Sequence, residues 1–218
     1  MRQQRLTWTI GGVGLVLCGV IGLLQYSVFG IAQVTGIVLD AVFAASVLLF
    51  AIGLSPQSSV VARRPLGVAA LVIVALWPLL IRAVAQLLPT MDAATFDAGL
   101  DAYRDAGRVL TAAFFVNLLV SVAATLLACV QIARAKAVPS PWKWAPLWAL
   151  IAWSVAAVAQ QFLYPAAAST GLQGYAEAAF LLAALAFLAQ TIGLGLIALV
   201  LSARVRSDTV DIYRSRAE

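Results

Sequence analysis

The stretch LGVAALVIVALWPLLIRAVAQLL, residues Leu66–Leu88, decides the fold class of this chain. A helix of about 20 apolar residues crosses the roughly 30 Å hydrocarbon core of a bilayer, and this run is long enough to do so. A membrane-spanning strand is excluded, because such strands alternate apolar and polar residues over about ten positions. Three residues interrupt the apolar run toward its end: Pro78, Arg82 and Gln86. The stretch therefore predicts a transmembrane helix with polar groups near one end.

The rest of the chain repeats this pattern. Its 218 residues are 63% hydrophobic and 11% charged, with a mean hydropathy of +1.00, whereas soluble domains are about half apolar and about a quarter charged. Residues 1–206 are expected to form a single all-α bundle of a polytopic membrane protein, followed by a polar tail over residues 207–218. Six spans are predicted, at about residues 8–29, 34–54, 66–88, 108–132, 144–164 and 175–201.

The basic residues predict the orientation of the spans. Eleven of the fourteen lysines and arginines lie in the N-terminal segment, the second and fourth loops and the tail; Arg104 and Arg108 lie in the third loop, and Arg82 lies inside a span. Lys and Arg are enriched in short cytoplasmic loops. Both termini are therefore predicted to be cytoplasmic, in a multi-pass protein of the plasma (inner) membrane. The same role accounts for the net charge of +5, so a nucleic-acid partner is not expected.

The residue inventory argues against an enzyme or a cofactor protein. The chain has no histidine, and its two cysteines, Cys18 and Cys129, fall in separate apolar runs without a CxxC motif. We therefore predict no catalytic residue, no metal site and no cofactor, and expect both cysteines to act as small packing residues. A lipid-modifying enzyme is the weakest alternative, because a nucleophile needs an activating base and Asp40 is the only acid at depth in a span.

Asp40 and Arg82 are predicted to be neighbours. Asp40 lies six residues inside the outer start of the second predicted span, and Arg82 lies six residues before the outer end of the third. At 1.5 Å per residue, both are roughly 9 Å below the same boundary. Because an isolated charge in a span costs about 2.5–3.5 kcal/mol on insertion scales, we expect these opposite charges to pair, directly or through water.

Other polar residues inside the spans are candidates for a pathway or binding site. Gln86, Asn117 and Gln160 fall in the predicted outer half, and Gln190 lies near the middle of the last span. Asn117 belongs to a stripe of small and weakly polar residues at every fourth position: Ala113, Asn117, Ser121, Thr125 and Cys129. This face should look into the bundle, either lining a polar pathway or packing against another helix. Pro78 is expected to kink the third span.

Two features near the membrane surfaces complete the picture. The apolar residues of the third loop have helical spacing, which predicts an amphipathic outer helix over about residues 91–107, with Thr90 or Thr95 as its cap. Four tryptophans near the inner ends of spans are expected to form an interfacial aromatic belt rather than a ligand-binding cage: Trp8, Trp142, Trp144 and Trp148.

Two functions remain open from the sequence. The first is a membrane transport component, either a small permease or the membrane subunit of a transporter, with an outward-facing polar cluster around Asp40 and Arg82. The second is a non-catalytic structural or accessory subunit of a membrane complex, in which the same polar residues only bond to one another. Besides the lipid bilayer, the expected partners are other membrane subunits or further copies of the chain.

Overall fold

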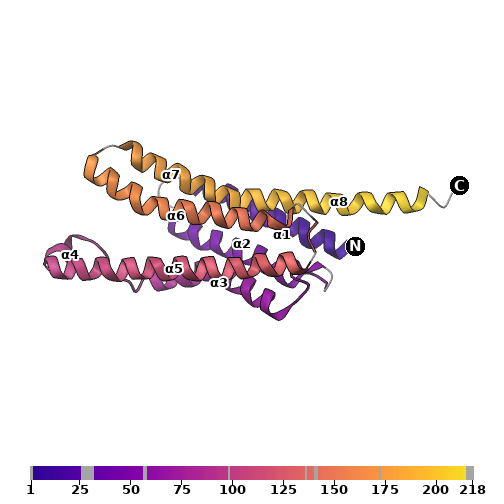
Figure 1. The fold of residues 1–218 in the computed structure, drawn as a ribbon, viewed down its shortest axis with the longest axis horizontal. Helices are drawn as coiled ribbons and strands as arrows, with labels where there is room; N and C mark the ends of the chain where they lie inside the picture. Colours follow the sequence, from indigo (N-terminus) through magenta and orange to yellow (C-terminus); the bar gives the residue numbers. More distant parts are fainter. Residues whose placement is uncertain are drawn as a thin grey trace.

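The computed structural model describes residues 2–25, 32–55, 58–97, 99–135, 137–139, 142–171 and 173–214 (Figure 1). Helices account for 88% of the structure, which confirms the predicted all-α class. The main helices are α1 (Arg2–Gln25), α2 (Ala32–Ile52), α3 (Pro65–Ala85), α4 (Ala93–Asp97), α5 (Leu100–Ala135), α6 (Ala145–Thr170), α7 (Gln173–Leu188) and α8 (Leu194–Arg214). The predicted end of the first span, up to Phe29, lies outside the described residues.

In this described part, six helical stretches are long and apolar enough to cross a membrane, as the sequence predicted. They are Gln3–Leu24, Thr35–Ile52, Pro65–Ala85, Leu100–Ala135, Trp142–Leu163 and Gln173–Arg204. The last joins α7 and α8 through the π-helical turn η3 (Ala189–Gly193), and a short 3-10 turn, η2 (Trp142–Trp144), precedes α6.

The long helices form a ring. Around it, α1 packs on α2 and α8, α2 on α3, α3 on α5, and α6 on α7, while the contact between α5 and α6 that completes the ring is less extensive. Both chain ends lie at one end of the bundle and α4 lies at the other (Figure 1). We call these the terminal end and the hairpin end.

The outside of the ring is apolar. Large apolar side chains are more than half exposed on several spans, including Leu119 on α5, Phe162 on α6 and Leu185 on α7. Soluble proteins rarely expose contiguous apolar surface of this kind, whereas lipid requires it. The exposed surface and the six long apolar helices support a membrane location.

Glycines bring α1 and α8 into backbone contact. A Cβ added at Gly195 would lie 2.8 Å from the carbonyl oxygen of Gly12, so each position leaves room only for hydrogen. A Cβ at Gly19 would collide with Ile192 and approach the Oγ1 of Thr191 to 2.7 Å, so the π-helical turn rests on α1 as well. Small residues permit close helix approach in membranes, and here they hold α1 closely between α2 and α8 in the ring.

The hairpin end differs in detail from the prediction of one helix over residues 91–107. The structure has the short α4, a break at Gly99, and then α5, which runs unbroken for 36 residues from Leu100. Gly99 has a φ of 113°, a conformation that residues with a side chain avoid, and this explains the break. At 1.5 Å per residue α5 is about 54 Å long, so it extends well beyond the hydrocarbon core.

Asp92 caps α4. Its Oδ1 accepts hydrogen bonds from the backbone N–H and the hydroxyl of Thr95, both at 2.9 Å, and its Oδ2 accepts one from the Thr90 hydroxyl at 2.8 Å. The two threonines expected as caps therefore support an aspartate cap. These hydrogen bonds, the one from the Thr95 backbone first, lower the pKa of Asp92 below its usual value.

Candidate functional site

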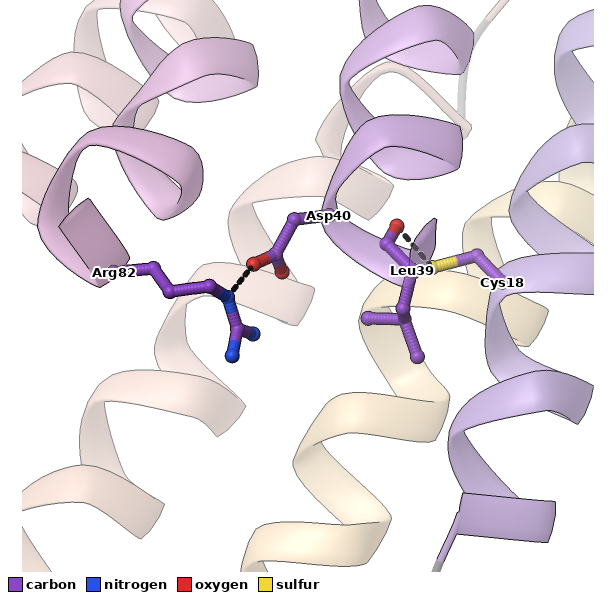
Figure 2. Close-up of polar contacts among 4 residues, drawn as sticks. All are labelled: Cys18, Leu39, Asp40 and Arg82. Atoms are coloured by element: carbon purple, nitrogen blue, oxygen red, sulfur yellow. Dashed lines mark hydrogen bonds and ion pairs between the residues drawn. The ribbon is translucent and has the colours of Figure 1, made fainter. Parts of the chain in front are cut away.

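Asp40 and Arg82 form an ion pair between α2 and α3, which confirms the predicted pairing (Figure 2). The Nε of Arg82 donates to the Oδ2 of Asp40 at 2.5 Å. The side chain of Asp40 is 11% exposed and that of Arg82 is 41% exposed, so the carboxylate is the more deeply buried partner. Pairing removes most of the cost of holding either charge inside the bundle.

Gly36 makes room for the guanidinium. It precedes Asp40 by one helical turn, so both residues lie on the same face of α2. A Cβ at position 36 would lie 2.8 Å from Nη1 of Arg82 and 3.1 Å from its Cζ. The guanidinium therefore lies against the backbone of α2. Our sequence reasoning missed Gly36; the signal that could have found it is the glycine four residues before the acid.

A second contact holds α2 from the opposite side. The thiol of Cys18 on α1 donates to the carbonyl oxygen of Leu39 at 3.7 Å, and Figure 2 shows it on the side of α2 away from Arg82. Cys18 is fully buried. At this level α2 is therefore held between α1 and α3, which agrees with a packing role for Cys18.

Arg82 lies closer to a helix end than the sequence indicated. The predicted third span continued to Leu88, but α3 ends at Ala85 and the chain goes on in tighter turns. Pro89 contributes to the early end, because it has no backbone N–H for the carbonyl of Ala85 four residues earlier and its ring would clash with that carbonyl. Arg82 is consequently in the last turn of α3, where the helix dipole also favours a cation.

A cavity of about 290 Å³ lies between the helices of the ring and is partly open to the outside. All six spans contribute to its wall, which is mostly apolar and includes four tryptophans: Trp8, Trp77, Trp142 and Trp153. The predictions made for two of these tryptophans are corrected by the structure. Trp8, which is only 5% exposed, and Trp142 were predicted to lie in an interfacial belt, but both line the cavity. Trp144 and Trp148 are exposed on the bundle, at 42% and 69%, as a belt requires.

The cavity lies on the terminal side of the ion pair. On α2 its wall begins at Phe43, three residues beyond Asp40, and on α3 it ends at Pro78, four residues before Arg82. The pair is thus about one turn, or about 5–6 Å, past the cavity toward the hairpin end. The sequence had suggested an outward-facing polar cluster around Asp40 and Arg82, whereas this cavity is mostly apolar and lies between these residues and the terminal end.

The segment that follows α2 folds back against its end and contributes to the cavity wall at the terminal end. Ser59, Val60 and Arg63 all donate hydrogen bonds to carbonyls at the end of α2. Val60 lines the cavity and Val61 is fully buried. These residues lie between the second and third predicted spans, and the apolar pair Val60–Val61 was the available signal in the sequence that they fold inward.

The predicted stripe on α5 faces the interior. Ser121, Thr125 and Cys129 line the cavity, and Asn117, one turn nearer the hairpin end, accepts a hydrogen bond from the indole N–H of Trp77 at 2.7 Å. Helix packing therefore accounts for Asn117, whereas lining of a polar pathway stays a prediction for the other positions. Asn117 joins α5 to α3, and the positions beyond it form cavity wall.

The remaining candidates do not gather around the ion pair. Gln190 lies in the π-helical turn and lines the cavity. Gln86 is exposed and Gln160 is half-buried on α6. Within the described residues, no hydrogen bond connects any of these glutamines to Asp40 or Arg82. The structure thus places Gln190 on the cavity wall and Asn117 in the contact between α5 and α3, and it leaves Gln86 and Gln160 apart from the wall.

Pro78 belongs to the cavity wall. The helix α3 is continuous through it, so the expected kink stays a prediction. Because proline has no backbone N–H, the carbonyl of Val74, another wall residue, lacks its usual partner four residues on. Pro78 therefore leaves a backbone acceptor beside the cavity.

The chemistry available in this site is binding rather than coordination. Among the described residues, no group of three His, Cys, Asp or Glu side chains could hold a metal ion. None of the described residues that line the cavity is Asp, Glu, Lys or Arg.

No family model, curated protein or solved structure matches the sequence. Fold and site together define a helical-bundle protein suited to a membrane, with a mainly apolar internal cavity.

Proposed function

We propose that this protein is a membrane transport component, either a small permease or the membrane subunit of a larger transporter, and that the cavity is part of its pathway. The observation that carries the proposal is the position of the cavity between two different closures. The Asp40–Arg82 pair joins α2 to α3 on one side of it, and residues 58–64 cover the other. Transporters need an internal site whose two sides open separately.

In the proposed orientation the terminal end faces the cytoplasm and the hairpin end faces outward, because short basic loops stay on the cytoplasmic side. The ion pair is then the outer closure, and residues 58–64 are the inner one. Breaking the Asp40–Arg82 pair would free α3 from α2 one helical turn beyond the cavity on its outer side. The inner closure would open by releasing the hydrogen bonds that residues 58–64 make to the end of α2.

The proposal can be tested without knowing the substrate, because Cys129 lies on the cavity wall. The chain has two cysteines, so Cys18→Ser leaves Cys129 as the only thiol. The rate at which the membrane-impermeant thiol reagent MTSES labels Cys129 would be measured from each side of oriented vesicles. We expect slow labelling from both sides in this background.

Asp40→Asn in the same background should raise labelling from the outer side about tenfold, which corresponds to a closure stabilised by about 1.4 kcal/mol. Arg82→Gln should act in the same direction, and labelling from the cytoplasmic side should not change. Asp40→Glu, which keeps the charge, is the matched control. Unchanged outer labelling in both neutral variants, or an equal rise from the two sides, would contradict the proposed outer closure.

A second function, an accessory subunit of a membrane complex, is favoured by the surface of the hairpin end. Leu87 is 85% exposed, Phe96 59% and Leu100 62%, and these residues alternate with acidic side chains near a membrane boundary. Such a surface suits another membrane subunit or a second copy of this chain. Gentle extraction followed by native mass measurement decides the point, since a lone protomer without a partner would count against the accessory role.

A further inference from the structure

The cavity wall carries polar side chains that have no protein partner. Elsewhere in the spans, the buried hydroxyls of Thr7, Ser46 and Thr191 each donate to a carbonyl four residues earlier in their own helix. Ser121 and Thr125 on the cavity wall make no hydrogen bond with another described residue. In a membrane interior, polar groups need a partner. These two hydroxyls are therefore available to something inside the cavity.

A third polar group on the wall has the same property. Gln190 belongs to a π-helical turn, a distortion that often marks functional positions, and its amide also makes no hydrogen bond with another described residue. Most of the remaining wall is apolar or aromatic. The cavity thus presents a small number of polar groups on a large apolar surface, which is the composition of small-molecule sites.

The volume and the charges limit what can bind. An apolar protein cavity of about 150 Å³ holds one benzene molecule, so about 290 Å³ holds roughly twelve carbon atoms. The described wall has no ionised side chain, and Asp40 and Arg82, about one turn beyond it, are paired with each other. A charged ligand would lose its hydration without gaining a counter-ion.

We propose that the cavity binds an uncharged amphiphile, with an apolar body of about ten to twelve carbon atoms and one hydroxyl or carbonyl group that bonds to Ser121, Thr125 or Gln190. This inference rests on the proposed function, because it names the class of substrate that the pathway would carry. The apolar body lies against the aromatic wall, and the polar group meets the unpartnered side chains.

Three naphthalene compounds of similar size test the class: 2-naphthalenemethanol, 2-ethylnaphthalene and 2-naphthoate. Their binding to the protein in lipid nanodiscs is measured by equilibrium dialysis, with empty nanodiscs as the reference for partition into lipid. We expect the alcohol to bind about tenfold more tightly than the hydrocarbon, as one or two hydrogen bonds in an apolar cavity would produce. The carboxylate should bind at least about tenfold more weakly than the alcohol.

Two sets of variants locate the site. Ala124→Phe fills the cavity and should abolish binding of the alcohol, whereas Ala123→Phe places the same ring on the exposed side of α5 and should leave it unchanged. Ser121→Ala combined with Thr125→Val and Gln190→Leu removes all three polar groups with little change of size. It should bring the alcohol and the hydrocarbon within about twofold of each other.

The proposal is overturned if the hydrocarbon or the carboxylate binds the natural protein as well as the alcohol does. It is also overturned if Ala124→Phe binds the alcohol normally, or if the triple variant keeps the tenfold preference. The labelling of Cys129 separates this result from the transport proposal. Binding without a controlled outer closure would retain the ligand site and remove transport.

Discussion

Substitution of Gly36 by alanine gives a quantitative test of the ion pair, because two effects of similar size oppose each other there. Alanine in a helix interior is favoured over glycine by about 0.8–1.0 kcal/mol. The new methyl group, however, would lie 2.8 Å from Nη1 of Arg82 and must push the guanidinium away from α2. A hydrogen bond to a charged group contributes about 1.5–3 kcal/mol.

Only part of that contribution should be lost. Arg82 is 41% exposed and Asp40 11% exposed, and the guanidinium is the end of a flexible side chain that can move and keep some attraction. We take the loss as about 1–2 kcal/mol, toward the low end of the range for charged groups. In the natural chain Gly36→Ala should therefore change the free energy of unfolding by about 0 to 1 kcal/mol in the destabilising direction.

The sign should reverse once the guanidinium is removed. In an Arg82→Ala background, Gly36→Ala has nothing to displace and should stabilise the protein by about 1 kcal/mol. The four proteins form a double-mutant cycle with an expected coupling of about 1–2 kcal/mol, measured by reversible unfolding in mixed micelles. Gly107→Ala, at an open position on α5 where a Cβ would meet only Met91 at 3.7 Å, is the control and should stabilise both backgrounds equally. A stabilisation by Gly36→Ala of the same size in both backgrounds would refute the contact.

Three further predictions concern other polar contacts. The backbone N–H of Leu54 donates to the Thr7 hydroxyl at 3.1 Å. Thr7→Val removes this acceptor and should destabilise the bundle by about 1–2 kcal/mol, whereas Thr7→Ser, which keeps the hydroxyl, should cost less in the same unfolding assay. Trp77→Phe removes the 2.7 Å hydrogen bond to Asn117 and should cost about 1 kcal/mol, whereas Trp77→Phe in an Asn117→Leu background should cost measurably less. The hydrogen bonds that lower the pKa of Asp92 stabilise α4 at neutral pH. This stabilisation should fade as the pH falls below the ordinary aspartate pKa of about 3.9 and through the lowered value. Amide exchange in the first turn of α4, corrected for its intrinsic rate, should therefore rise over that range in the natural protein and not in Asp92→Ala.

The span pattern and the ion pair could be predicted because hydropathy, depth in a span and charge all follow from residue types and their positions along the chain. Hydropathy over about 20 residues identifies a helix that can cross a membrane, whatever surrounds it. The pairing of Asp40 with Arg82 followed from depth and charge alone, since an unpaired charge inside a span is costly. The inward direction of the α5 stripe followed from the spacing of its small residues.

Facing and closure could not be predicted in the same way. Trp8 stands near a span end, as belt tryptophans do, but it points into the ring because α1 is held between α2 and α8 by glycine contacts. Residues 58–64 are polar enough for a loop, yet Val60 lines the cavity and Val61 is fully buried. The break at Gly99 and the early end of α3 depend on local backbone conformation, which hydropathy does not register.

The six apolar helices and the pairing of the two deep charges follow from the amino-acid sequence, because lipid leaves few alternatives for apolar runs and for buried charges. The position of the cavity depends on the fold. A cavity is what remains after helix faces have packed, and that depends on contacts between residues distant in the chain, such as Gly12 with Gly195 and Gly36 with Arg82. Because of these contacts, the cavity lies beside the polar half of the bundle, where the sequence had placed the candidate site, and its wall is mostly apolar and aromatic.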